Sequence, residues 1–188
     1  MLRLFVALRP PKPVADAMLG LLTGLDLPRH RPTPEGQVHL TAVYVGERAD
    51  RERESAEASV EAGCRGIAPF ELRPLRLAML PEKGMKRTVV DICDRPPELL
   101  EMHRRLVQRF ARDIRTAADT DRFLPHVTIA RFSGAGVVVA PERRVDRPLD
   151  LPPFEVRTVH LMSSDLKPEG AEHRHLLELR LHGELVRR

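Results

Sequence analysis

Two short segments of the same form stand nearly half the chain length apart: HLTA at residues 39–42 and HVTI at residues 126–129. Side chains two residues apart in a β-strand point to the same face. In each segment the histidine and the threonine would therefore share one face, and the two apolar residues would share the other. The pattern predicts two strands, each packed against a core on one side and each presenting an imidazole and a hydroxyl group on the other.

The spacing of apolar residues predicts strand–helix–strand units in both halves of the chain. Strands are expected at residues 2–9, 38–46, 70–80, 87–93, 126–132, 154–162 and 175–182, helices at residues 14–25, 49–63 and 96–114, and a Gly/Pro-rich connection at residues 133–153. These elements predict an α+β fold over residues 1–188 as one bilobal domain. Two similar lobes, continuous in sequence or not, would each contribute one motif, with antiparallel sheets facing a central cleft and helices outside.

The composition fits a folded protein that lies outside the membrane. Hydrophobic residues make up 42% of the chain and charged residues 31%, and no stretch approaches the roughly 18 apolar residues of a membrane span. The apolar run at the N-terminus is too short for a signal peptide, so we expect a cytoplasmic protein. Cys64 and Cys93 have no CxxC spacing, which predicts two reduced thiols rather than a disulfide.

The net charge of +4 and the pI of about 9.6 favour a polyanionic partner, but only weakly. Most of the basic residues are arginine, which suits phosphate contacts but also follows from genome base composition. Arginines clustered on one surface would favour phosphate contacts, whereas scattered arginines would favour base composition. Five arginines lie along or just beyond the helix expected at residues 96–114, as either a solvated face or an RNA-backbone patch: Arg104, Arg105, Arg109, Arg112 and Arg115.

Paired histidines suit acid–base chemistry on a phosphodiester. Because free histidine has a pKa near 6.5, one imidazole can act as a neutral base while the other acts as a cationic acid. The threonine hydroxyls can donate to phosphate oxygens as negative charge builds on them. Such a site needs no carboxylate cluster and no metal, and it suits a strained cyclic phosphate. The alternative is that both histidines are ordinary strand residues with satisfied hydrogen bonds.

A rival interpretation is a metal site at Glu172, His173 and His175. The two histidines would share a strand face, and imidazole is a good zinc ligand. However, no further ligands stand at recognisable spacing and neither cysteine is near in sequence. We therefore expect neither a metal nor another cofactor.

Four segments together resemble the RNA 2′,3′-cyclic phosphodiesterase (2′–5′ RNA ligase) family of the two-histidine phosphoesterase superfamily. They are RLFVALRPP at residues 3–11, VHLTAVYVGE at 38–47, FLPHVTIAR at 123–131 and SSDLKPEG at 163–170. The chain departs from the family in having Ala-Val-Tyr after the first HLT, in lacking tryptophan, and in having His173 where tyrosine is common.

The resemblance implies a bilobal fold and hydrolysis of a terminal 2′,3′-cyclic phosphate on RNA or nucleotides to a 2′-phosphate. By motif, His39 would be the proton donor to the leaving 3′-oxygen and His126 the proton acceptor that activates water, with Thr41 and Thr128 on the phosphate. The resemblance also implies reversible 2′–5′ RNA ligation. We expect a monomer. The alternative function is a non-catalytic nucleotide- or RNA-binding module that uses the same cleft.

Three further residues lie just beyond the motifs. Arg131 follows His126 by five positions, so regular alternation would put it on the opposite face. It would contact the substrate phosphate only if the strand contains a β-bulge or if it reaches the cleft from the strand end; otherwise an ion pair is expected. Tyr44 and Phe132 could stack on a base, with core packing favoured for Phe132.

Overall fold

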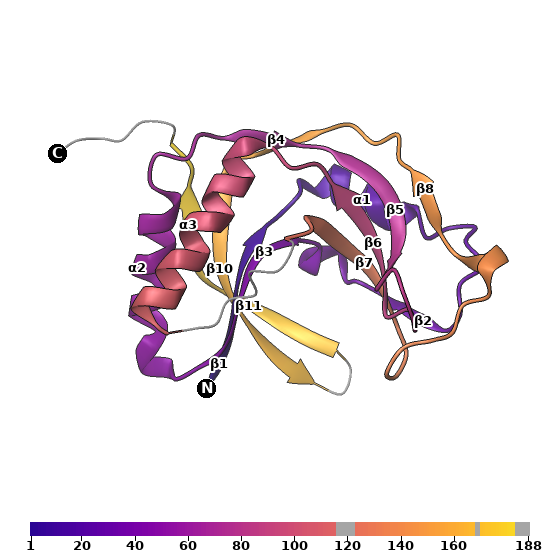
Figure 1. The fold of residues 1–188 in the computed structure, drawn as a ribbon, viewed down its shortest axis with the longest axis horizontal. Coiled ribbons are helices and arrows are strands. Elements are labelled where there is room, and N and C mark those ends of the chain that lie inside the picture. The colour runs from indigo at the N-terminus through magenta and orange to yellow at the C-terminus, as the bar shows by residue number, and fades with distance from the viewer. Residues whose placement is uncertain (116–122, 168–169, 183–188) are drawn as a thin grey trace.

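The computed structural model describes residues 1–115, 123–167 and 170–182, which form strands and three α-helices (Figure 1). The strands are β1 (Leu2–Leu8), β2 (His30–Pro32), β3 (Leu40–Arg48), β4 (Phe70–Leu72), β5 (Pro74–Leu80), β6 (Thr88–Cys93), β7 (His126–Phe132), β8 (Asp146–Pro148), β9 (Phe154–Val156), β10 (Thr158–Lys167) and β11 (Gly170–Arg180). The helices are α1 (Lys12–Gly20), α2 (Arg53–Cys64) and α3 (Pro97–Asp113).

Nine of these strands form one antiparallel sheet in the order β11-β10-β1-β3-β7-β6-β5-β8, with β2 paired to β7, while β4 and β9 pair separately. At the centre, β3 and β7 meet at Leu40 and Val127. Each half of the sheet combines early and late parts of the chain, because β10 and β11 join β1 and β3, and β8 joins β5. The antiparallel α+β fold is confirmed. That the halves form two similar lobes of one domain stays a prediction.

Helices α2 and α3 lie side by side outside the half of the sheet that contains β1, β3, β10 and β11 (Figure 1). The apolar residues of α3 that recur every three to four positions are fully buried, as expected from their spacing. A glycine in α2 permits this close packing, because a Cβ atom at Gly63 would lie only 2.8 Å from Cδ2 of Leu106. The part of the chain that the structure describes contains no helix long and apolar enough to cross a membrane.

The helix expected at residues 14–25 is wrong at its C-terminal end. The α-helix ends at Gly20, and turns follow in which the Thr23 amide donates to the Gly20 carbonyl. Gly24 then takes a φ of 79°, which ends the helical path because glycine adopts this conformation without steric cost. Leu21, Leu22 and Leu25 still pack against the core, which explains their helical spacing.

Other boundaries also differ from expectation. The segments at 70–80 and 154–162 each divide into two strands, and the Gly/Pro-rich connection at 133–153 contains β8. β2 and β8 are three-residue strands that contain proline, which lacks the amide donor and is confined to such short or marginal strands. β3 begins at Leu40, two residues later than expected, so His39 stands immediately before it. β11 begins at Gly170, five residues earlier than expected.

One buried carboxyl group lies outside the cavity described below. Asp91 of β6 is fully buried and pairs with Leu77 and Val127, both of which belong to the core. Neither of its oxygens has a hydrogen-bond partner among the described residues. Burial raises the pKa of Asp91 to about 7, since the charged form is poorly solvated there.

Candidate active site

The two motifs face one cavity of about 580 Å³. Both histidines and both threonines line it: His39 immediately before β3, Thr41 in β3, and His126 and Thr128 at the start of β7. The residues between them, Leu40 and Val127, are fully buried on the other face. The sheet thus brings together the four residues that the motif spacing selected, because β3 and β7 are neighbours.

The two motif segments have the same pattern of burial over seven residues, starting from His39 and from His126. In each, the fourth residue of the motif is an extra residue in the strand pairing: Ala42 lies between positions paired with Val6 and Ala7, and Ile129 between positions paired with Val89 and Val90. Such a bulge shifts the alternation by one residue. The residue five positions after each histidine therefore returns to the cavity side of the sheet.

The bulge decides the position of Arg131. Arg131 pairs with Thr88 of β6, and Thr128 pairs with Val90 of the same strand. Thr88 and Val90 are two residues apart and share a face, so Arg131 shares the face of Thr128. Arg131 accordingly lines the cavity. The β-bulge that a contact between Arg131 and the substrate phosphate requires is therefore present, although the contact itself stays a prediction. Burial and the nearby guanidinium of Arg3 lower the pKa of Arg131.

Each imidazole is held by a backbone carbonyl two residues upstream. Nδ1 of His39 lies 2.6 Å from the oxygen of Gln37, and Nδ1 of His126 lies 2.8 Å from the oxygen of Leu124. A carbonyl oxygen can only accept, so Nδ1 carries the proton in both rings. Nε2 is then the nitrogen left for proton transfer, and the equivalent hydrogen bonds give both rings the same tautomer.

The free protein keeps His39 neutral near pH 7. Burial is the main cause that lowers the pKa of His39 to about 4; the hydrogen bond to Gln37 opposes this shift, and the nearby His173, Arg131 and Arg9 contribute to it. Loss of solvation penalises the imidazolium form, and the neighbouring cations repel it. A group of opposite charge would be needed in the cavity for His39 to hold a proton at neutral pH.

Further polar side chains complete the cavity wall, and they lie outside the two His-x-Thr motifs. They come from the loop after β2, the loop after β7 and the hairpin of β10 and β11: Thr33, Gln37, Ser133, Lys167, Glu172 and His173. Thr33 Oγ1 also donates to the carbonyl of Thr128 at 2.8 Å, which ties its loop to β7. Glu172 and His173 were considered only as part of a rival metal site, and no periodic pattern in the sequence marks the other four residues.

The proposed metal ligands do not gather as a metal site. Among the described residues, no group of three His, Cys, Asp or Glu side chains is placed to hold a metal ion. Glu172 instead contacts Nζ of Lys167, and His175 lies 3.1 Å from a guanidinium nitrogen of Arg9. Independence from metals stays a prediction.

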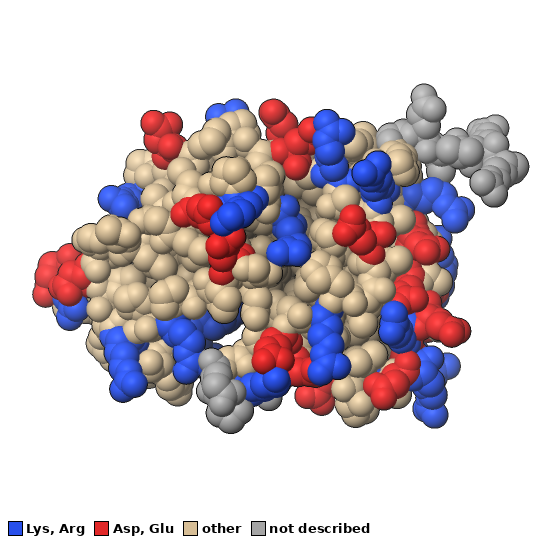
Figure 2. All heavy atoms as spheres, turned by 180° about the vertical axis from the view of Figure 1, so that it is seen from behind, with Lys and Arg blue, Asp and Glu red and all other residues tan. Residues whose placement is uncertain are grey.

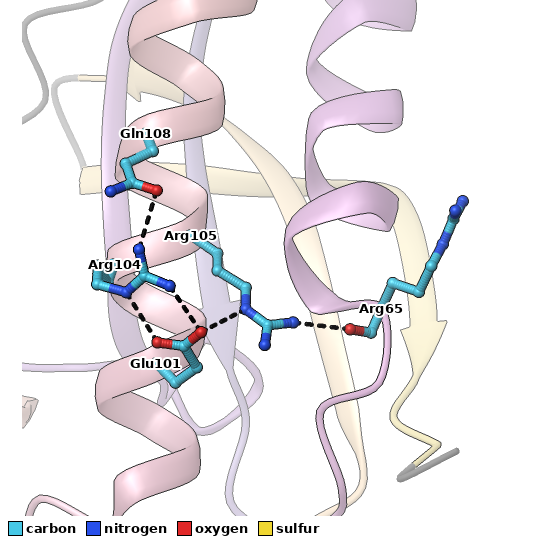
Figure 3. A network of polar contacts seen from close by, with 5 residues as sticks. All are labelled: Arg65, Glu101, Arg104, Arg105 and Gln108. Carbon is cyan, nitrogen blue, oxygen red and sulfur yellow. Dashed lines mark hydrogen bonds and ion pairs between the residues drawn. The ribbon is translucent and has the colours of Figure 1, made fainter. Parts of the chain in front are cut away.

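Three arginines of α3 pair with acidic neighbours on their own helix. Glu101 accepts hydrogen bonds from both Arg104 and Arg105, and Arg105 also donates to the carbonyl of Arg65, just after the end of α2 (Figure 3). Arg112 pairs with Asp113. The face of the molecule seen from behind in Figure 2 likewise carries both signs of charge interspersed. These contacts favour the solvated-face interpretation of α3 over an RNA-backbone patch.

The two aromatic residues next to the motifs have different environments. Phe132 is buried, with 6% of its surface exposed, and it belongs to the core. Tyr44 is 47% exposed, and its hydroxyl accepts a hydrogen bond from Nε of Arg3 at 2.7 Å. The expected core packing of Phe132 is confirmed, and stacking of a base on Tyr44 stays a prediction.

Comparison with known proteins identifies relatives of similar length and fold. The chain is 29% identical to an RNA 2′,3′-cyclic phosphodiesterase of Thermus thermophilus, and the match covers 97% of this chain and 92% of that one. The crystal structure of TT0787 of Thermus thermophilus superposes with a TM-score of 0.83 at 27% identity, over 97% of this chain and 99% of the other. The crystal structure of apo LigT of E. coli superposes with a TM-score of 0.72 at 18% identity, over 95% of this chain and 96% of the other. At this identity the likeness shows the fold alone.

The fold and the cavity define a class of proteins in which two His-x-Thr strands of one antiparallel sheet line one cavity. Within that class the family is shown by sequence. The profile of the 2′-5′ RNA ligase superfamily matches residues 10–168, which is most of the chain and includes both motifs. The protein belongs to the 2′-5′ RNA ligase superfamily.

Proposed function

We propose that the protein hydrolyses terminal 2′,3′-cyclic phosphates on RNA or nucleotides to 2′-phosphates by paired-histidine acid–base catalysis. The observation that carries the proposal is the equivalence of the two motifs. Each presents an imidazole whose Nδ1 is fixed by a carbonyl, and each adds a threonine on the same cavity wall. The named activity of the Thermus thermophilus relative supports the same reaction.

In this reaction Nε2 of His126 accepts a proton from water, and the water oxygen attacks phosphorus opposite the 3′-oxygen. Nε2 of protonated His39 donates to that 3′-oxygen as the bond to phosphorus breaks. The ring opens to a 2′-phosphate and a free 3′-hydroxyl. Thr41 and Thr128 donate hydrogen bonds to the non-bridging oxygens, and Arg131 neutralises part of their charge.

The acid role of His39 depends on the substrate. The pKa of about 4 in the free protein leaves little imidazolium at neutral pH. A phosphate in the cavity brings a negative charge next to the ring, which favours the protonated form. Substrate binding would therefore create the acid that the reaction needs.

Two other functions would use the same groups in the cavity. Ligation of RNA through a 2′–5′ bond is the same in-line opening of the cyclic phosphate, in which a 5′-hydroxyl takes the place of water and the 3′-oxygen again leaves. The alternative function is a module that binds nucleotides or RNA without turnover. Two matched imidazoles with free Nε2 atoms favour the enzyme, because binding alone does not require a second proton-transfer group. Monomeric state and cytoplasmic location stay predictions.

The direct test is incubation with 2′,3′-cyclic nucleotides in EDTA, followed by identification of the monophosphate isomer. We expect the 2′-phosphate, at a rate that EDTA leaves unchanged. Binding without turnover would favour the alternative function. A substrate with sulfur in place of the leaving 3′-oxygen separates the two histidines, since sulfur departs with little protonation. His39→Ala should lose far less on this substrate than on the normal one, whereas His126→Ala should lose equally on both; the reverse result would exchange the roles.

A further inference from the structure

A third imidazole stands beside His39. The ring of His173, from β11, lies 5.1 Å from that of His39, centroid to centroid, at an interplanar angle of 78°. Phe5 of β1 lies at similar distance from both rings, 5.1 Å from His39 and 5.0 Å from His173. The three rings form one cluster, and both histidines of the cluster line the cavity.

The two ring nitrogens of His173 have different environments. Nδ1 is buried and has no hydrogen-bond partner among the residues that the structure describes. A buried N–H without an acceptor is rare in proteins, whereas an unused acceptor is found more often. A neutral imidazole carries one proton on one of its nitrogens. In His173 that proton therefore belongs on Nε2, which is the opposite tautomer to that of His39 and His126.

Charge also keeps this ring neutral. Burial lowers the pKa of His173, and the guanidinium groups of Arg131 and Arg9 lower it further. Protonation would add a charge near two cations and an N–H group at a nitrogen that has no acceptor. A ring that stays neutral with its proton on Nε2 is neither the general acid nor the general base. Its remaining chemistry at Nε2 is to donate a hydrogen bond.

We propose that His173 is a substrate-binding residue whose Nε2–H donates to an oxygen of the terminal ribose phosphate on the side of His39. The nature of the ligand rests on the proposed function, whereas the donor role rests on the geometry of the ring. Ribose phosphates in this position offer mostly acceptor oxygens, which a neutral donor can bind without repelling the imidazolium that forms on His39. The edge of one ring against the other also fixes the orientation of His39.

Two substitutions separate the donor from the ring. His173→Phe keeps an aromatic ring against His39 and Phe5 but removes the donor, and His173→Gln keeps a neutral N–H donor but removes the ring. The Kd of a nucleoside 2′-monophosphate is measured by calorimetry at pH 7, together with kcat/KM on a 2′,3′-cyclic nucleotide. Loss of one neutral hydrogen bond predicts up to about tenfold weaker binding and slower turnover for His173→Phe, with partial recovery in His173→Gln.

The matched control is His175→Phe. His175 lies two residues further along the same strand face, but its ring contacts Arg9 and His160. We expect this variant to bind and turn over within about twofold of the wild type, since twofold is below the usual effect of one hydrogen bond.

Three results would overturn the donor role. The first is a His173→Phe variant that binds the monophosphate as tightly as the wild type. The second is equal weakening in the Phe and Gln variants at unchanged melting temperature, which would assign the effect to the ring. The third is a melting temperature that falls in proportion to the loss of binding. Absent turnover in the wild type would instead contradict the proposed function, and the Kd comparison would still test His173.

Discussion

Phosphate binding should raise the pKa of His39 by about three units. In the free protein that pKa is about 4. To act as an acid near pH 7, the ring must gain about 4 kcal/mol of stabilisation for its charged form, at about 1.4 kcal/mol per pKa unit. One negative charge about 4 Å from the imidazolium supplies about 4 kcal/mol at an effective dielectric constant of about 20. A single phosphate is therefore sufficient to bring the pKa of His39 to about 7.

The assay is a pH titration of the histidine ring resonances by NMR, with and without saturating nucleoside 2′-monophosphate. His39→Gln assigns the resonance of interest, and His126→Ala removes coupling between the two motif histidines. His103, whose Nδ1 is bonded to the Ala42 carbonyl and whose ring stacks on Phe123, serves as an internal reference outside the cavity. We expect the ligand to move the His39 midpoint from about 4 to about 7.

The same shift should divide the pH profiles. Activity that needs protonated His39 falls as the pH rises through its pKa. The basic limb of kcat/KM reports the free enzyme and that of kcat reports the complex. The limb of kcat should therefore lie about three pH units above that of kcat/KM, as the pKa argument requires. An unliganded midpoint near 6.5 would refute the desolvation argument, and a midpoint that ignores the ligand would remove His39 from the acid role.

Three further predictions concern single side chains. His39→Ala and His126→Ala should each lower kcat by about 10²- to 10⁴-fold, with the double variant little worse than the poorer single; near-normal turnover in either would exclude the pair. Thr128→Val should slow turnover by about 10²-fold because the shape remains while the donor is lost, and full activity would eliminate its role. Asp91→Asn should stabilise the protein at pH 8 by up to about 4 kcal/mol and little at pH 4, because the folded protein holds the proton up to about pH 7 while the unfolded chain releases it near 3.8, so wild-type stability falls as the pH rises between these values. Thermal melting at both pH values measures this effect, and parallel pH dependence of the two proteins would contradict it.

Local pattern was sufficient for the centre of the site and insufficient for its edges. Alternation and matched motifs selected His39 and His126, because a strand face follows directly from residue spacing. The same alternation could not place Arg131, since a one-residue bulge moves its side chain to the opposite face of the sheet and no feature of the sequence indicates the bulge. His173 was considered only as a metal ligand. Its contact with His39 joins residues far apart in the chain, and residue spacing does not show which strands pair in the sheet.

The same limit applies to the fold. The helix α3 has a long apolar stripe and two prolines at its start, so its position followed from the sequence with an error of about one residue at each end, well within the usual uncertainty of helix ends. The strands β2 and β8 are three residues long and mostly exposed, so no alternation could reveal them. They form because neighbouring strands offer unpaired backbone groups, which is a property of the assembled sheet.

The proposed reaction depends on the orientation of each imidazole and on the distance between the two, and Leu40 and Val127 bear on the distance alone. The carbonyls of Gln37 and Leu124 set the aim of each imidazole within its own segment. The distance between the two imidazoles depends instead on the pairing of β3 with β7. A displacement of about 1 Å between reacting groups can cost about 10²-fold in rate. Substitution of Leu40 and Val127 by larger or smaller apolar residues would therefore change the distance between the imidazoles and suit a larger or smaller cyclic ester. The two histidines themselves would remain unchanged.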